Sequence, residues 1–428
     1  MTESRTHPIV LPYGQGYVRL TLNIPFENIH LIQPHYPPPL PDPADAILGQ
    51  LATPIHSSPL ASLVKPSDHV VIVTSDVTRP VPNRLIIPLL LRHLGLHADR
   101  LTILLANGTH RPNSHAEIAA MFGRTIANSV VIRNHDALDP QMNQLAGHTE
   151  SGTPVYLNKH YLNADVRICL GFIEPHFFAG FSGGAKSIIP GIAGFQTILH
   201  SHRPSLIADD NCTWGKLASN PMRAEIEAMV QLCPPDFMIN VTVDAEKHIT
   251  GVFCGDIIRA HREGCRYAWN HCMLPVDRYY PLVITSNGGY PLDLNLYQSI
   301  KGMSAASQIV SQNGAIVLIS ECADGIPDNS SFHKMLASLP SKQDLHRWVA
   351  EQLSPQLDLW QVQILDRILR RATVYARTSL PASDIAACKL QPIHVLDNCL
   401  NQLIRDIGHD ACVAVLPDGP YTIPFWEG

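Results

Sequence analysis

The stretch from residue 176 to residue 192, HFFAGFSGGAKSIIPGI, holds one formally charged residue, Lys186, among glycines and large apolar residues. The glycines at 180, 183 and 184 leave room for a bulky planar group to approach the backbone closely. An apolar environment lowers the pKa of a lysine and makes its amine nucleophilic. We therefore interpret the stretch as a covalent tether for a cofactor or substrate. The alternative is a surface lysine whose stem covers the neighbouring phenylalanines.

Residues 180–187, GFSGGAKS, also match the phosphate-binding pattern G-x-x-x-x-G-K-S except where Ala185 replaces the second glycine. Residues 171–179 separate this motif from the preceding predicted strand, whereas a P-loop follows its strand directly. Pro190 would also interrupt the helix that a P-loop needs. A P-loop-like nucleotide-dependent transferase is therefore the alternative function rather than the preferred one.

Polar residues follow three of the predicted strands, in SDVTRP (75–80), NGTHRP (107–112) and the loop over 171–187. Ligands of open parallel sheets bind beyond the carboxyl ends of the strands, so these loops should meet at one site. Taken singly, the residues have simpler explanations as helix caps, turn residues or surface charges. Together they would suit a carboxylate or a phosphate. The candidates are Asp76, Thr78, Arg79, His110, Arg111, His176 and Lys186.

Two histidines, His200 and His202, follow in TILHSHRP (197–204). One of them could ligate a metal beside whatever Lys186 holds. Residues i and i+2 diverge on a helix, so both could share a site only in a strand or loop. Their spacing alone fits a pair of surface histidines equally well.

Apolar runs that alternate with helical stretches predict the elements that position these loops. The first block has predicted strands over 69–76, 101–108, 129–136 and 165–172, a pair of strands within 236–256 and a helix over 257–273. The second block has predicted strands over 281–289 and 314–320, a helical region over 342–371, strands in TVYART and IHVLD, and a last strand in ACVAVLPDGPYTIPFW.

We therefore expect an α/β protein of two domains with the active site in the cleft between them. The first is a Rossmann-like parallel-sheet domain over residues 1–270, and the second a smaller α/β domain over 280–398. The C-terminal segment, about 405–428, should pack back on the first domain. The proline-rich first sixty residues predict an extended lead-in that carries no chemistry.

The composition excludes several classes of protein. A formal net charge of −6 argues against nucleic-acid and anionic-membrane binding. No signal peptide or membrane span of about 20 apolar residues is evident, so we expect a cytoplasmic protein. The 10 cysteines include no C-x-x-C pair, which argues for reduced thiols rather than disulfides or a zinc ribbon.

The motifs taken together resemble the lactate racemase family. They are SDVTRP, NGTHRP, EPHFFAGFSGGAKSIIPGIAG, HSHRP, GGYPLDLNLYQSIKGM and LWQVQIL, in the order of the family, from about residue 70 to the C-terminus. The resemblance implies a 2-hydroxyacid racemase with a nickel-pincer nucleotide, pyridinium-3,5-bisthiocarboxylic acid mononucleotide nickel. The cofactor would be attached covalently to Lys186. The partners implied are a small 2-hydroxyacid and the proteins that make the cofactor.

The same resemblance implies roles for individual residues. Lys186 is the tether, His202 the nickel ligand, and His200 a weaker candidate for that ligand. His110 and His176 exchange a proton with the substrate hydroxyl, and Arg79 binds the substrate. The second domain would contribute Tyr297, Gln298, Lys301 and Trp360. The nucleotide would be held by Asp76 and Thr78, with Gly183 and Gly184 leaving space for the cofactor.

The implied chemistry inverts the C2 centre through a 2-keto intermediate. Removal of the hydroxyl proton on either face needs a base, and two histidines can supply it near neutral pH. Arg79 and Lys301 would anchor the carboxylate. Lactate is the best-known substrate of the family, and a non-catalytic cofactor-binding homologue is a further alternative. A pyridoxal-phosphate racemase would also use a lysine.

Overall fold

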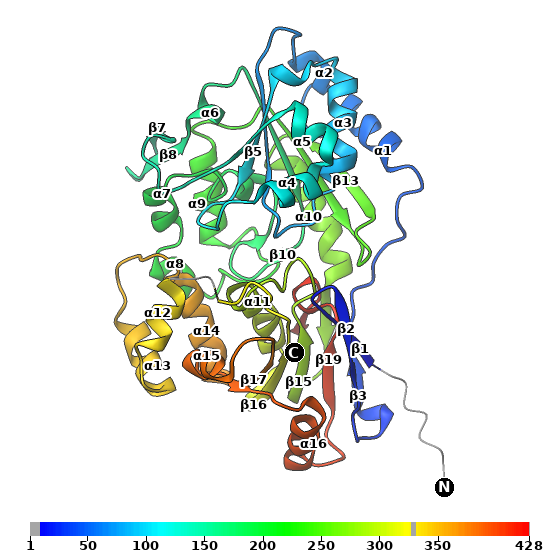
Figure 1. Cartoon of the computed structure of the whole chain (residues 1–428), viewed down its shortest axis with the longest axis vertical. Helices are drawn as coiled ribbons and strands as arrows, with labels where there is room; N and C mark the ends of the chain where they lie inside the picture. Colours follow the sequence, from blue (N-terminus) through cyan, green and yellow to red (C-terminus); the bar gives the residue numbers. More distant parts are fainter. Residues whose placement is uncertain (1–8, 327–330, 428) are drawn as a thin grey trace. The chain divides into compact units, whose positions relative to one another are not determined.

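The computed structural model describes residues 9–326 and 331–427 and divides into two compact units (Figure 1). The lysine unit comprises Tyr36–His202 and Asp209–Asn270, and contains Lys186. The terminal unit comprises the described residues up to His35, the segment Arg203–Ala208 and the chain from His271 onward. No helix among the described residues is long and apolar enough to cross a membrane.

The lysine unit is built on a six-stranded sheet in the order β13-β12-β9-β4-β5-β6. All neighbouring strands are parallel except β13, which is antiparallel to β12. The strands are β4 (Val70–Ser75), β5 (Leu101–Ala106), β6 (Val131–Asn134), β9 (Val166–Phe172), β12 (Phe237–Val243) and β13 (Ile249–Gly255). The central strands are mostly apolar and buried, which is typical of a sheet covered on both faces. The strands predicted for this block are confirmed.

Helices and two small hairpins complete the lysine unit. The helices are α1 (Pro43–Ala52), α2 (Leu60–Leu63), α3 (Asn83–Leu94), α4 (His115–Phe122), α5 (Arg124–Ser129), α6 (Lys159–Leu162), α7 (Phe195–Ser201), α9 (Pro221–Val230) and α10 (Arg259–Cys272). The hairpins are β7–β8 (Asn143–His148 and Pro154–Asn158) and β10–β11 (Pro175–His176 and Gly180–Phe181). Ser114 and Glu117 form the predicted capping box at α4.

The terminal unit is built on a second six-stranded sheet, parallel throughout, in the order β18-β17-β16-β15-β19-β3. The strands are β3 (Ile29–Leu31), β15 (Tyr280–Ser286), β16 (Val310–Ile319), β17 (Ala372–Arg377), β18 (Gln391–Pro392) and β19 (Val413–Leu416). The helices are α8 (Pro204–Ala208), α11 (Leu296–Ser307), α12 (Ser331–Ala337), α13 (Lys342–Glu351), α14 (Leu359–Arg371), α15 (Ala382–Ala387) and α16 (Leu396–Ile407).

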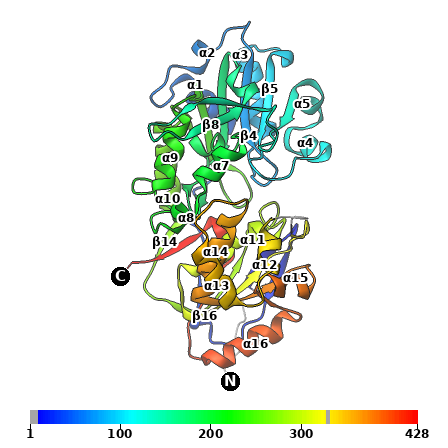
Figure 2. The same ribbon diagram turned by 90° about the vertical axis from the view of Figure 1, so that its left-hand side faces the viewer.

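The two faces of this second sheet bury different partners. One face packs against α16 and against the hairpin of β1 (Ile9–Tyr13) and β2 (Gly16–Leu20), in a core that contains Leu11, Leu282 and Leu400. Helices α11 and α14 pack against each other and against the strands, and α13 packs against α14 (Figure 2). This division follows from the alternation of side chains along each strand.

The chain ends differ from the expectation. We expected residues 405–428 to pack back on the first domain, but β19 lies between β15 and β3 in the sheet of the terminal unit. The last strand, β20 (Ile423–Trp426), pairs with β14 (Met273–Val276). The expected boundaries of 1–270 and 280–398 therefore also differ from the observed units. An apolar strand such as VAVL can complete either parallel sheet, so its sequence does not say which.

Two further elements differ from the expectation. The predicted strand in IHVLD is shifted, because β18 is a two-residue strand at Gln391–Pro392 and the chain enters α16 at Leu396. The lead-in is not only extended: its hairpin β1–β2 contributes Leu11 and Leu20 to the core of the terminal unit. The 10 cysteines are free, and most are buried, as predicted.

The packing of the lead-in hairpin predicts a stability effect. Leu11 is 0% exposed whereas its neighbour Val10 is 39% exposed. Leu11→Ala should lower the free energy of unfolding by about 2–5 kcal/mol because it leaves a cavity in the core. Val10→Ala, the matched control, should change it by no more than about 0.5 kcal/mol. Urea unfolding of both variants measures the difference, and equal midpoints would contradict this view of the hairpin.

Candidate active site

The three polar loops begin at one edge of the sheet of the lysine unit. They follow β4, β5 and β9, which are neighbours, and Ser75 at the end of β4 lies opposite Ala106 at the end of β5. After β4, the chain first forms β5 and β6 on one side of it. It then forms β9 and β12 on the other side. The boundary between β4 and β9 is therefore the point where the strand order reverses, the usual ligand-binding position of such sheets.

Asp76 links the first two loops. Its carboxylate accepts hydrogen bonds from the backbone N–H and the hydroxyl of Thr78, and lies 2.7 Å from Nδ1 of His110. Burial alone would raise the pKa of Asp76, but the neighbouring His110, Thr78 and Arg79 outweigh it and hold the pKa at about 2. The carboxylate is therefore ionised at neutral pH and accepts Nδ1–H of His110. In the neutral ring, Nε2 is then the unprotonated nitrogen.

Arg79 links the first loop to the third. Its Nε lies 2.7 Å from Oε1 of Glu174, and its Nη1 donates to the carbonyl and hydroxyl oxygens of Thr78. Among the described residues, no hydrogen bond involves its Nη2. The ion pair with Glu174 fixes the orientation of the Arg79 guanidinium, and its Nη2 can still donate to an anion. The sequence analysis did not select Glu174, although it lies within the motif EPHFFAG.

His176 is buried in the short β10–β11 hairpin. Its Nδ1 faces the backbone N–H groups of Phe178 and Ala179 at 3.4 Å and 3.3 Å, and its ring packs on Phe177 and Phe178. An N–H group can only donate, so Nδ1 is the acceptor and the proton of the neutral ring lies on Nε2. The neutral rings of His110 and His176 thus carry their protons on different nitrogens.

Lys186 lies in a short 3-10 helix, Gly184–Ser187, and its amine is mostly shielded from solvent. Nζ lies 5.6 Å from the centre of the Phe178 ring, and among the described residues it makes no hydrogen bond or ion pair. Burial and the charges of Arg79 and Arg223 lower the pKa of Lys186 to about 7, with Glu174 opposing them. A large share of the amine is therefore neutral and nucleophilic at neutral pH.

The P-loop alternative does not fit this arrangement. The β10–β11 hairpin separates the end of β9 from the motif, and the helix that carries Lys186 ends at Ser187. A P-loop instead places its lysine at the start of a long helix directly after a strand.

Buried side chains hold the backbone of this lysine loop, residues 179–187, from below. Arg223 donates to the carbonyls of Ala179 and Phe181, and Nε2 of His261 lies 2.8 Å from the carbonyl of Ser182. Oδ1 of Asn240 accepts the N–H of Gly184 at 2.8 Å. These contacts satisfy polar backbone groups that a buried loop cannot leave unpaired. Sequence reasoning missed all three side chains, because they lie 36 or more residues beyond the end of the loop they support.

Two glycines of the loop are required by their surroundings. Gly183 and Gly184 have φ of 76° and 54°, a region that other residues rarely adopt. A Cβ at Gly184 would lie 2.5 Å from the ring of His261, and one at Gly183 would lie 2.6 Å from Oδ1 of Asn240. These glycines therefore allow the supporting side chains, rather than only a ligand, to approach the loop.

His202 ends helix α7, and its ring packs edge-on against Phe178. Nδ1 lies 2.9 Å from the hydroxyl oxygen of Ser201 and 3.1 Å from the carbonyl of Ile198, to which that hydroxyl donates. With both oxygens accepting from Nδ1–H, the lone pair that ligates metals is on Nε2. Burial and the charge of Lys186 lower the pKa of His202 to about 3. His200 instead pairs with Glu225 at 2.7 Å and with Thr153, as expected for an i, i+2 pair on a helix.

The terminal unit contains the remaining four predicted site residues on two packed helices. Tyr297, Gln298 and Lys301 lie on α11, and Trp360 on α14. Nε1 of Trp360 donates to the hydroxyl of Tyr297 at 2.7 Å. Burial raises the pKa of Tyr297 well above its usual value, so its hydroxyl stays protonated at neutral pH. Lys301 lies one turn after Tyr297, on the same side of the helix.

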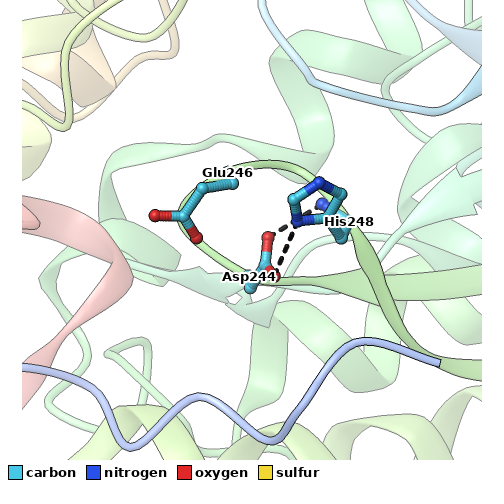
Figure 3. A group of neighbouring side chains, drawn as sticks. All are labelled: Asp244, Glu246 and His248. Atoms are coloured by element: carbon cyan, nitrogen blue, oxygen red, sulfur yellow. Dashed lines mark hydrogen bonds and ion pairs between the residues drawn. The ribbon is translucent and has the colours of Figure 1, made fainter. Parts of the chain in front are cut away.

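A separate group of possible metal ligands lies in the turn between β12 and β13. Ligand atoms of Asp244, Glu246 and His248 lie within 4.8 Å of one another, and Nδ1 of His248 lies 3.1 Å from Asp244 (Figure 3). The side chain of His248 is 63% exposed. The hydrogen bond to Asp244 accounts for its position, so we assign no metal to this group.

The support of the lysine loop predicts a local effect of one methyl group. Gly184→Ala should destabilise the protein by about 1–3 kcal/mol more than Gly95→Ala, because only the first places a Cβ against a buried ring. Gly95, the control, also has a positive φ, 62°, and has no atom within 4 Å of such a Cβ. Urea unfolding gives both values, and equal losses would mean that His261 does not support the loop.

Comparisons with known proteins identify the family of the chain. The profile of the lactate racemase N-terminal domain matches residues 13–215, and that of the lactate racemase C-terminal domain matches residues 278–423. The lactate racemase of Lactiplantibacillus plantarum is 36% identical over 380 residues, which cover 88% of this chain and 89% of that protein. The lactate racemase of Thermoanaerobacterium thermosaccharolyticum is 33% identical over 427 residues, or 97% of this chain and 98% of that protein.

Solved structures show the same relationship. The lactate racemase apoprotein of Thermoanaerobacterium thermosaccharolyticum superposes with a TM-score of 0.88 at 32% identity, covering 98% of this chain and all of that one. A protein from Thermotoga maritima, 18% identical with a TM-score of 0.71, shares the fold over 90% of this chain and 99% of that one. With both domain profiles matched and two relatives above 30% identity over nearly their full lengths, the chain belongs to the lactate racemase family of isomerases.

Proposed function

We propose that this protein is a racemase or epimerase of a 2-hydroxyacid, lactate or a related acid, that works through a 2-keto intermediate. The observation that carries the proposal is that Lys186 and His202 lie in the same unit, with both side chains beside the ring of Phe178. A shielded amine with a pKa near 7 can form a covalent bond, and a neighbouring imidazole presents Nε2 as a metal ligand.

These residues fit a nickel-pincer nucleotide. Lys186 would hold it covalently and His202 would ligate its nickel, with Phe178 in contact with both side chains. Gly183 and Gly184 contribute no side chains to the space above the loop. Asp76 and Thr78 would hold the nucleotide portion. When bound, such a cofactor would supply hydride-acceptor chemistry at C2 of the substrate.

The two histidines would move the proton of the substrate hydroxyl. The Asp76 carboxylate fixes the tautomer of His110, so Nε2 of His110 can accept a proton. The backbone amides that face Nδ1 of His176 leave the proton on Nε2, which can donate. A racemase must deprotonate the hydroxyl of one enantiomer and reprotonate the product on the other face. His110 would present an unprotonated Nε2 and His176 an Nε2–H group, so the two neutral rings would offer a proton acceptor and a hydrogen-bond donor to the substrate hydroxyl.

The carboxylate of the substrate needs cationic partners. Arg79 is fixed by Glu174 and Thr78 and retains Nη2 as a donor in a charge-assisted bond. Lys301 would contribute a second charge, and Gln298 further hydrogen bonds. The Trp360–Tyr297 bond fixes the two aromatic side chains that would lie beside the substrate.

The roles of the histidines predict a loss of turnover. Protein produced together with the cofactor-making proteins should invert at least one 2-hydroxyacid in a panel followed by chiral chromatography. His110→Ala and His176→Ala should each lower kcat by about 100-fold or more, because each removes a side chain that would move the proton of the substrate hydroxyl. Intact mass and nickel content would show that both variants are still loaded.

His200→Ala is the matched control, because His200 pairs with Glu225 and Thr153 instead. It should retain activity within a few-fold. Loaded wild-type protein that inverts no acid in the panel would indicate a non-catalytic cofactor-binding homologue instead.

The pKa of Lys186 predicts a pH profile for its modification. A lysine is nucleophilic only when neutral, so a pKa near 7 means that labelling of Lys186 should be half-maximal near pH 7. An acylating reagent on the apoprotein, followed by peptide mass spectrometry, measures the rate at each pH. The exposed Lys216, labelled in the same samples, is the internal control. Identical profiles for the two lysines would contradict the proposed tether.

A further inference from the structure

A cavity of about 410 Å³ lies in the terminal unit, apart from every residue to which the racemase proposal assigns a role. It is at the carboxyl ends of β17 and β18, next to the turn of the β1–β2 hairpin. Its polar lining comes from Tyr13, Arg377, Thr378, Ser379 and His394. The edge beyond the carboxyl ends of parallel strands is where sheets of this kind bind ligands.

The charge in this cavity is positive and not neutralised by a contact. Arg377 is the last residue of β17, and among the described residues its side chain makes no ion pair or hydrogen bond. Glu321, whose charge raises the pKa of Tyr13, does not line the space. Asp293, the other acid near Tyr13, already accepts the N–H groups of Gly14 and Glu321. A guanidinium without a carboxylate partner favours binding of an anion.

Uncharged donors accompany Arg377. Burial raises the pKa of Tyr13, so its phenol stays protonated and can donate. Oγ1 of Thr378 accepts the N–H of Leu380 at 3.1 Å, and its own O–H can still donate. Ser379 differs, because its hydroxyl already donates to the carbonyl of Glu321. Arg377, Tyr13 and Thr378 therefore offer donors, and planar or tetrahedral oxyanions bind such sets.

The volume of the cavity and its apolar lining indicate which class of anion could bind there. A volume of about 410 Å³ is in the range of pockets for small organic molecules and exceeds the need of a bare inorganic ion. Apolar walls are contributed by Ala376, Leu380, Ile385, Pro392 and Ile393. A molecule with an anionic group for Arg377 and a carbon body for these walls fits both features.

We propose that this cavity is a second ligand site, which binds a small organic anion through a phosphoryl or carboxylate group on Arg377. The anion would also bridge Arg377 to Tyr13, and so connect β17 to the hairpin at the start of the described chain. A ligand that binds only the folded state stabilises it by mass action. The proposal is independent of the racemase activity.

The test is a binding measurement on the full-length apoprotein. Glycerol phosphate and succinate represent the phosphoryl and carboxylate classes, and sodium chloride at equal ionic strength is the reference. Isothermal titration and thermal unfolding should show saturable binding of at least one organic anion, beyond the effect of chloride. The anion that binds with the lower Kd shows whether the site prefers a phosphoryl or a carboxylate group.

Variants locate the binding in this cavity. Arg377→Met should weaken it at least tenfold, and Tyr13→Phe should weaken it a few-fold. Arg405→Met, on the exposed surface of α16 in the same unit, is the control and should bind as the wild type does. Binding that survives in Arg377→Met reports another site, such as Arg79, and would overturn the proposal, as would a response no larger than that to chloride.

Hydrogen exchange provides a measurement that does not depend on a variant folding. The anion should slow exchange in peptides from residues 9–20 and 372–380, which contain Tyr13 and Arg377. Protection confined to the lysine unit would place the anion elsewhere and contradict the proposal.

Discussion

The chemistry of the lysine unit depends on one constraint: an amine is held in a shielded position with more positive than negative charge around it. Nζ of Lys186 lies over the ring of Phe178, the charges of Arg79 and Arg223 lower the pKa of the amine, and the charge of Glu174 opposes them. A carboxylate in direct contact with the amine would keep it protonated and unreactive. Glu174 instead pairs with Arg79, so its charge is used to fix the arginine. The same arrangement therefore activates the lysine and orients the anion-binding group.

Maintaining that position requires a loop that is buried yet irregular, and such loops need hydrogen-bond partners. Arg223, His261 and Asn240 supply them from α9, α10 and β12. Burying the guanidinium of Arg223 costs free energy, which its bonds to the loop carbonyls offset. The glycines complete the arrangement, because any Cβ at 183 or 184 would collide with these supports. The glycine motif and the three distant side chains therefore hold the loop together, although only the motif can be recognised in the sequence.

The sequence predicted the elements around the site well, because apolar β-branched runs and capping residues act locally. The strands over 69–76 and 165–172 and the capping box of Ser114 are examples, and the loops after these strands contain the predicted polar residues. Partners distant in the chain were missed: Glu174 beside Arg79 and Arg223 beneath the loop. The destination of β19 was also missed, because any parallel sheet can accept a short apolar strand. Pairing of this kind is decided by tertiary packing rather than by local preference.

The connectivity of the chain adds a constraint on the proposed metal ligand. His202 is the last residue of its segment in the lysine unit, and the next six residues, Arg203–Ala208, belong to the terminal unit. In that segment, α8 packs on α14, where Arg367 donates to the carbonyl of Ile207 at 2.7 Å. Trp360 lies at the start of the same α14. The backbone beside the ligand is therefore fixed on one side by α7 and on the other by the helix that carries a predicted substrate contact.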